Sequence, residues 1–371
     1  MTLKYPHIPD SMVGSKHREA AVLAIIFTGL TIWALKLAQD PLPELTGDPH
    51  IIMKRSLRVA TSGNIYSTID PPLRYVPLAI LFWILNITTV GPEAAYITHL
   101  YSTMMSYVVL PATLYLLVRE TIDRKAALLV LLGVISWRLL GIGLNAYIHG
   151  YWMYDYTIPF IFIALTIAHR TILEDRQHHR FLLAAGTGFA VGVVGLNEYI
   201  LGAYTAGIVA VLFIFHNRIR ELILTGSIGA VMASSLMFMS SYAKDFIISS
   251  GDDRLKLLTV TAIPGNVIDI ITTPAYMLPV GLVVVAGVLY HWTRSPPTSS
   301  GVLVAACIVL GIGWHSRFVL SSGWFALLAQ YVGQYIVLAL AVQQVVDHVD
   351  GLVKAHLEEL IERGYSSDGR L

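Results

Sequence analysis

Charged residues are scarce in this chain, and their scarcity excludes most classes of soluble protein. They make up 13% of the 371 residues, against 55% hydrophobic residues, whereas an ordinary soluble domain has about 25% charged and 45–50% apolar residues. The mean hydropathy of +0.65 therefore indicates a membrane protein. An excess of basic charge is also missing, because the chain has 25 basic and 24 acidic residues. This balance argues against nucleic acid as a partner.

Cysteine is almost absent. The single Cys307 excludes an intrachain disulfide and a cysteine-based metal cage. The sequence also lacks a Gly-Lys-Ser/Thr phosphate loop, a His-Glu-x-x-His helix and a Gly-x-Ser-x-Gly elbow, so the chemistries of soluble nucleotides and hydrolases lose their support. The first 19 residues are polar and are followed by an apolar run at 20–38 that is long enough to span, which predicts an uncleaved anchor.

Long apolar runs recur along the rest of the chain. A spanning helix needs about 20 apolar residues, and the runs predict an all-α polytopic membrane protein with about ten transmembrane helices. They form a single domain over residues 1–346. Residues 347–371 form an amphipathic cytoplasmic tail that is expected to lie along the inner membrane surface or against a membrane-protein partner. The predicted spans lie near residues 20–38, 95–118, 126–145, 157–168, 181–196, 199–215, 222–242, 277–290, 301–315 and 324–346.

The basic residues predict which ends of these helices are cytoplasmic. An eleventh apolar stretch, Tyr75–Val90, is kept on the outer face, because counting it as a span would move Arg119 through Arg220 outside, against the positive-inside rule. Both termini are then cytoplasmic in a multi-pass protein of the cell membrane. Two long external segments follow, at about 39–94 and 243–276.

The first external segment contains a predicted short helix. Asp48 is its expected N-cap, Pro49 its first residue and Gly63 the residue past its end. One face is polar and the other apolar, so we expect the helix to lie on the membrane surface with its polar stripe toward an outer-leaflet headgroup. The polar stripe consists of His50, Lys54, Arg58 and Thr61, and the opposite face carries Ile52, Met53, Val59 and Ala60.

The order of these features resembles a known superfamily. A first span, then a loop opening with Asp48-Pro49-His50 and an amphipathic helix, then Gly63-Asn64-Ile65-Tyr66 and Asp70-Pro71-Pro72-Leu73-Arg74-Tyr75, is similar to the start of GT-C integral-membrane glycosyltransferases. That superfamily includes oligosaccharyltransferase catalytic subunits, protein O-mannosyltransferases and aminoarabinose transferases. The resemblance implies a GT-C-like fold, a catalytic role for Asp48, and a sugar donor linked to a polyprenyl phosphate or diphosphate.

Two later segments extend the resemblance. Asp155 stands where GT-C enzymes commonly hold a second acid, so the resemblance makes Asp48 and Asp155 a catalytic pair that would hold a divalent metal such as Mg²⁺ or Mn²⁺, or would divide into a base and an electrostatic stabiliser. The resemblance makes Arg317, between Trp314 and Trp324, a ligand of the donor phosphate. The alternatives are a helix cap for Asp155 and an interfacial anchor for Arg317.

The predicted function is transfer of a sugar from a polyprenyl-phosphate donor to a lipid, glycan or protein acceptor on the external face. The large soluble C-terminal domain of oligosaccharyltransferases is missing, which favours transfer of one sugar from a monophosphate donor. A transporter or lipid scramblase and a non-catalytic structural membrane subunit are the alternatives. The predicted substrate-binding residues are His50, Lys54, Arg58, Arg74, His149, Glu198 and Arg317.

Overall fold

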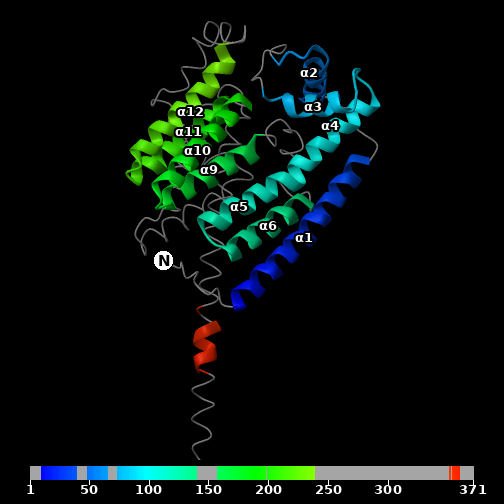
Figure 1. The fold of residues 1–371 in the computed structure, drawn as a ribbon. Coiled ribbons are helices and arrows are strands. Elements are labelled where there is room, and N and C mark those ends of the chain that lie inside the picture. Colours follow the sequence, from blue (N-terminus) through cyan, green and yellow to red (C-terminus); the bar gives the residue numbers. More distant parts are fainter. Residues whose placement is uncertain are drawn as a thin grey trace, which may run out of the picture.

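The computed structural model describes residues 10–39, 48–65, 73–139, 157–197, 199–238, 351 and 353–359. The regular structure in these ranges is helical throughout, without a strand (Figure 1), in agreement with the predicted all-α class. Residues 353–359 are helical within the predicted tail. The helices are α1 (Asp10–Gln39), α2 (Asp48–Ser62), α3 (Val76–Ile84), α4 (Pro92–Met104), the π-helical turn η1 (Met105–Val109), α5 (Leu110–Thr121), α6 (Arg124–Leu139), α9 (Ile158–Leu173), α10 (Gln177–Asn197), α11 (Tyr199–Phe215) and α12 (Ile219–Phe238).

Three of these helical segments are long and apolar enough to cross a membrane: Glu19–Gln39, Pro92–Thr121 and Gln177–Asn197. Two more are apolar but shorter, Ile158–Leu173 and Leu201–Phe215. All five coincide with predicted spans, so the chain has the character of an all-helical membrane protein. The spans predicted near residues 277–290, 301–315 and 324–346, and the second external segment, lie outside the described residues.

The apolar stretch Tyr75–Val90 forms only a short helix. α3 has nine residues, which gives a length of about 13 Å at 1.5 Å per residue. This is far below the hydrocarbon thickness of about 30 Å. By its length α3 cannot cross a bilayer, which agrees with the prediction that this stretch does not span.

Helices α4 and α5 join through η1 into one helical segment of 30 residues, Pro92–Thr121. The join coincides with Pro111, the second residue of α5. Inside an α-helix the proline ring clashes with the carbonyl four residues earlier, which here belongs to Tyr107 in the π-helical turn. The wider turn is the local adjustment that lets the helix continue past the proline.

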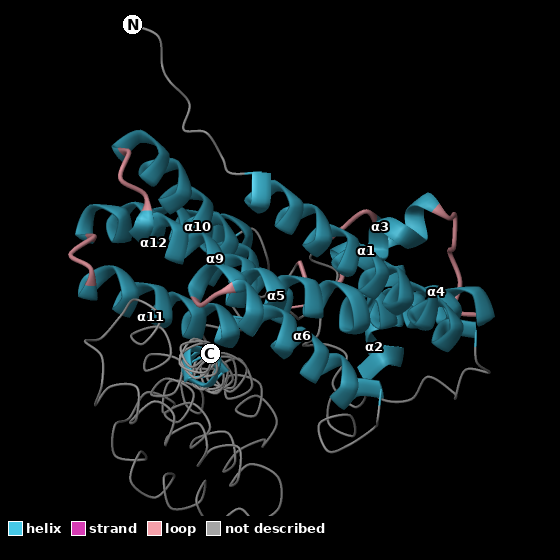
Figure 2. Cartoon of the chain, turned by 90° about the horizontal axis from the view of Figure 1, so that it is seen from below, coloured by secondary structure: helices cyan, strands magenta, loops and turns pink. Residues whose placement is uncertain are grey.

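The helices divide into neighbouring groups. α10 packs against α9, α11 and α12, while α5 packs against α6 and α9 and so joins that group to the N-terminal helices. α1 runs along α4 and η1. α2 and α3 pack on each other and beside α4, at the side of the molecule away from α12 (Figures 1 and 2).

Small residues set the spacing between α10 and α12. A Cβ atom added at Gly188 would lie 2.5 Å from the carbonyl oxygen of Thr225, and one at Gly192 would lie 2.9 Å from the Cβ of Met232. The Thr225 hydroxyl donates a 2.9 Å hydrogen bond to the Ala184 carbonyl across the same contact. Close backbone approach through glycine, with a hydroxyl bridging the helices, is a common way of packing helices in membranes.

Replacing Gly188 with alanine is therefore expected to destabilise the protein by about 1–3 kcal/mol, the usual cost of overpacking. The steric cost exceeds the gain of about 1 kcal/mol that alanine brings to a helix. The matched control is Gly226→Ala in α12, because nothing lies within 4 Å of a Cβ there. Thermal unfolding in detergent compares the two variants, and equal midpoints would contradict this packing of α10 on α12.

Candidate functional site

Helix α2 forms where the sequence predicts it. It runs over Asp48–Ser62, so the helix includes Asp48 itself, one residue earlier than an N-cap assignment places its start. Gly63 follows with a φ of +65°, a left-handed conformation that glycine adopts without steric cost. Its N–H donates a 3.0 Å hydrogen bond to the Val59 carbonyl, which satisfies one of the last carbonyls of the helix.

The apolar face of α2 is covered by protein. Ile52, Met53, Leu57 and Val59 are buried in one cluster with side chains of the segment that contains α3, among them Tyr75. We expected this face to rest on the membrane, and α3 occupies it instead. The far side of α3 exposes Ile80, Trp83 and Ile84. We name α2 and α3, together with the described residues 63–65 and 73–75 between them, the α2–α3 unit.

The predicted polar stripe lies on the opposite face of α2. Lys54, Arg58 and Thr61 are exposed and His50 is half-buried, so the stripe points away from α3. The Thr61 hydroxyl donates to the Leu57 carbonyl at 2.8 Å, a bond within the helix. The two cations are therefore accessible to an anion, as the prediction requires.

Arg55, which the sequence did not single out, braces the α2–α3 unit. Its Nη1 donates a 3.0 Å hydrogen bond to the hydroxyl of Tyr75, and its guanidinium lies 5.8 Å from the centre of that ring. Tyr75 is fully buried, so the cation–π contact and the hydrogen bond both act in partly desolvated surroundings. In the sequence, the only indication of this contact with Tyr75 was the position of Arg55, one residue after Lys54 of the polar stripe.

Arg74 joins the α2–α3 unit to the helix bundle. Its Nε donates a 3.1 Å hydrogen bond to the carbonyl of Asn197, the last residue of α10, and the backbone N–H of Leu73 donates to the Leu196 carbonyl at 3.1 Å. Arg74 is 7% exposed. Because the last carbonyls of a helix lack partners and carry partial negative charge, a guanidinium is well suited to this position. Arg74 was predicted to bind substrate, and the structure uses its Nε to hold the loop.

The contact of Arg74 brings two predicted regions together. Asn197 directly precedes Glu198 in the sequence, and the first long loop meets the last residues of α10 at one end of the bundle. The placements of Glu198, His149, Asp155 and Arg317 lie outside the described residues, as does the side chain of Asp48. Within the described ranges, no group of three or more His, Cys, Asp or Glu side chains is suited to a metal ion, and a metal at Asp48 and Asp155 stays a prediction.

Paired charges mark the other end of the bundle. Glu19 of α1 is buried, accepts a hydrogen bond from the Tyr115 hydroxyl and lies 2.8 Å from the Nε of Arg124. The Nε of Arg180 lies 2.5 Å from the Oε1 of Glu221, and this ion pair joins the starts of α10 and α12. The sequence assigned these arginines to one side of the membrane, and the structure pairs them with acids at the same end of the helices.

His216, between α11 and α12, lies at this end. Burial, and then the charge of Arg218, lower the pKa of the His216 imidazole below its ordinary value. The Nη2 of Arg218 itself donates to the carbonyl of Ile172 near the end of α9 at 3.1 Å. A neutral His216 therefore adds no further cation beside Arg218 at pH 7.

Comparison with known proteins adds no assignment: no protein-family model matches the chain, and no curated protein and no solved structure matches it.

Proposed function

We propose that this protein is an integral-membrane glycosyltransferase that moves one sugar from a polyprenyl-phosphate donor to an acceptor on the external face. The proposal takes up the resemblance to GT-C enzymes and includes their multi-pass architecture, with about ten spans and both termini cytoplasmic. The acceptor is a lipid, a glycan or a protein. Asp48 and Asp155 are the proposed catalytic acids.

One observation carries the proposal: the loop that begins with Asp48 is a folded unit fixed to the bundle. Arg74 binds the end of α10, Arg55 binds Tyr75, and the apolar face of α2 is buried against α3. A catalytic carboxylate has to be held in place to within a fraction of an ångström. A solvated linker between two spans needs no buried core of its own. This packing therefore favours a functional site over a loop that only connects the spans.

The arrangement also suits a lipid-linked donor. The exposed Trp83 and Ile84 of α3 are residues that favour the boundary between headgroups and acyl chains. Helix α2 packs on the other face of α3, and a usual helix spacing of about 8–10 Å would bring it to the level of the headgroups in the proposed orientation. Lys54 and Arg58 are exposed there, within reach of a sugar phosphate at the membrane surface.

The proposed chemistry is a substitution at the anomeric carbon. The acceptor oxygen or nitrogen forms a bond to this carbon as the bond to the phosphate oxygen breaks, and the electron pair leaves with the phosphate. Asp48 accepts the proton of the acceptor, a general-base contribution of typically 10²–10⁴-fold. The departing phosphate needs positive charge more than a proton, which is the proposed role of Arg317 and of the cations on α2.

Turnover of a donor panel tests the proposal. Purified protein in lipid nanodiscs receives radiolabelled polyprenyl monophosphates that carry single hexoses, pentoses or amino sugars, together with a membrane lipid extract as acceptor. We expect one donor to lose its label to the acceptor or, more slowly, to water. Loss of turnover in EDTA that Mg²⁺ or Mn²⁺ restores would support the metal. Binding of donors without any turnover would contradict the transferase and favour a transporter.

A further inference from the structure

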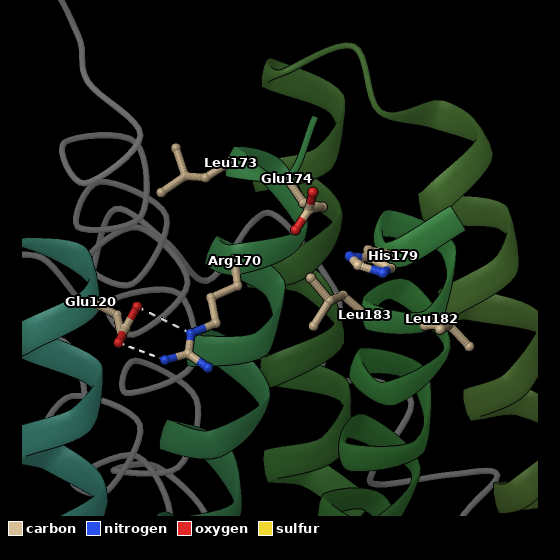
Figure 3. Close-up of a pocket in the computed structure, with 7 residues that line it drawn as sticks. All are labelled: Glu120, Arg170, Leu173, Glu174, His179, Leu182 and Leu183. Atoms are coloured by element: carbon tan, nitrogen blue, oxygen red, sulfur yellow. Dashed lines mark hydrogen bonds and ion pairs between the residues drawn. The ribbon is translucent and has the colours of Figure 1, made fainter. Parts of the chain in front are cut away.

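A pocket with a volume of about 510 Å³ lies between α5, α9 and α10, at the end of the bundle that carries the paired charges. Figure 3 shows its polar residues: Glu120 from α5, Arg170 from α9, Glu174 from the turn after α9, and His179 from the first turns of α10. Its volume falls in the range of sites that bind small molecules, about 300–1,000 Å³. No predicted site residue lines it.

Glu120 holds the guanidinium of Arg170 through two hydrogen bonds, which use two of its five N–H groups. Its Nε and Nη2 donate to the two carboxylate oxygens of Glu120 at 3.1 and 2.6 Å. A guanidinium has five N–H donors, and the remaining three make no hydrogen bond in the part of the chain that the structure describes. Arg170 is also half exposed in its side chain. It can therefore bind an anionic oxygen without giving up Glu120.

Glu174 adds a negative group to the same pocket. One of its carboxylate oxygens accepts the backbone N–H of Arg176 at 3.0 Å, which fixes the side chain on the turn. With Glu120 already neutralised by Arg170, Glu174 carries the remaining negative charge. The lining thus combines N–H donors on a guanidinium whose charge Glu120 balances with a net negative charge on Glu174, and a ligand that carries an ammonium as well as a phosphate complements it better than a simple anion.

The other walls are apolar. Leu173, Leu182 and Leu183 line the pocket, and the first two are each 60% exposed. At the ends of membrane helices, long charged side chains reach the interface while apolar groups lie toward the acyl chains. The leucines provide a surface for the acyl chains of a lipid whose headgroup fills the polar side.

We propose that this pocket binds the headgroup of a zwitterionic aminophospholipid from the leaflet at this end of the bundle. The phosphodiester accepts hydrogen bonds from the two N–H groups of Nη1 and the second N–H of Nη2 of Arg170, the ammonium donates to Glu174, and the acyl chains lie on the leucines. The site is independent of the proposed sugar transfer. It lies at the start of α10, about 30 Å along this 21-residue helix from its contact with Arg74.

Native mass spectrometry of the detergent-solubilised full chain tests the site. Phosphatidylethanolamine and phosphatidylglycerol with the same acyl chains compete for the protein, and we expect the former to bind at least about 5-fold more tightly, because a charge-assisted hydrogen bond replaces a neutral one. Glycerophosphoethanolamine provides the same headgroup without chains. If it competes as well as the lipid at equal concentration, the ligand is a soluble phosphate ester and the lipid proposal is overturned.

A matched pair of variants assigns the binding to the pocket. Glu174→Gln removes the charge but keeps an oxygen for the N–H of Arg176, so the turn is retained, and we expect the preference for phosphatidylethanolamine to disappear. Asp175→Asn changes the net charge equally at the neighbouring, exposed position outside the lining, and should preserve the preference. Equal effects of the two variants, or no lipid preference in the unchanged protein, would overturn the proposal.

Discussion

Asp48→Asn is expected to lower sugar transfer by about 10²–10⁴-fold while the protein folds and binds its donor normally. The carboxylate is the proposed base, and its loss removes the general-base contribution of that size. Asparagine supports a helix start as well as aspartate does, so α2 keeps its N-terminus. Donor turnover measures the first effect, and the thermal midpoint measures the second.

Two further variants isolate the reason for this loss. Asp48→Glu keeps the charge but moves it by about one bond length, and a misplacement near 1 Å costs about 100-fold, so it should fall between the asparagine variant and the unchanged protein. Asp175→Asn removes a carboxylate at the opposite end of α10 and should leave transfer unchanged. Transfer by Asp48→Asn at the rate of the unchanged protein would rule out Asp48 as the base.

Arg74→Ala is expected to reduce kcat by about 100-fold, because the α2–α3 unit loses its attachment to α10 and the proposed base is no longer held in place. It should also cost about 1–3 kcal/mol of stability, since the buried carbonyl of Asn197 loses its donor. Hydrogen exchange over residues 48–85 reads out the attachment directly. We expect faster exchange there and little change in α10 away from its end.

The split between KM and kcat decides between two roles for Arg74. A substrate-binding arginine raises KM on removal, whereas a positioning residue lowers kcat. Arg176→Ala, at an exposed arginine directly before the start of α10, is the control for loss of one positive charge. A rise in KM with unchanged hydrogen exchange would contradict the positioning role.

Local features of the sequence predicted much of the α2–α3 unit. Pro49 and Gly63 mark the ends of α2, because each restricts or permits a particular backbone conformation, and the 3.6-residue period separates Lys54 and Arg58 from Ile52 and Met53. The balance of charge across the loops kept Tyr75–Val90 out of the spans, and α3 is indeed too short to cross. Each of these inferences depends on residues close together in the chain.

Periodicity gives the face of a helix but not what covers it. The apolar face of α2 fits a membrane surface and a neighbouring helix equally well, so its burial against α3 could not be read from the sequence. The contact of Arg74 with Asn197 joins residues 123 positions apart. The ion pairs Glu19–Arg124 and Glu120–Arg170 likewise join different helices, so they become visible only in the tertiary structure. Asp155 and Arg317 rest on the resemblance alone, and Glu198 rests on the predicted topology, which places its turn on the outer face.

The length of the Pro92–Thr121 segment ties the proposed site to the thickness of the bilayer. Thirty residues make a helix of about 45 Å, and fitting it within a 30 Å hydrocarbon core would need a tilt of about 48°, beyond the usual range of 0–40°. Part of the segment must then stand outside the core. Because α2 and α3 pack beside α4, in the proposed orientation a thinner bilayer would leave Asp48 farther from the acyl chains, and a thicker one would bring it toward the phosphate of the proposed lipid-linked donor.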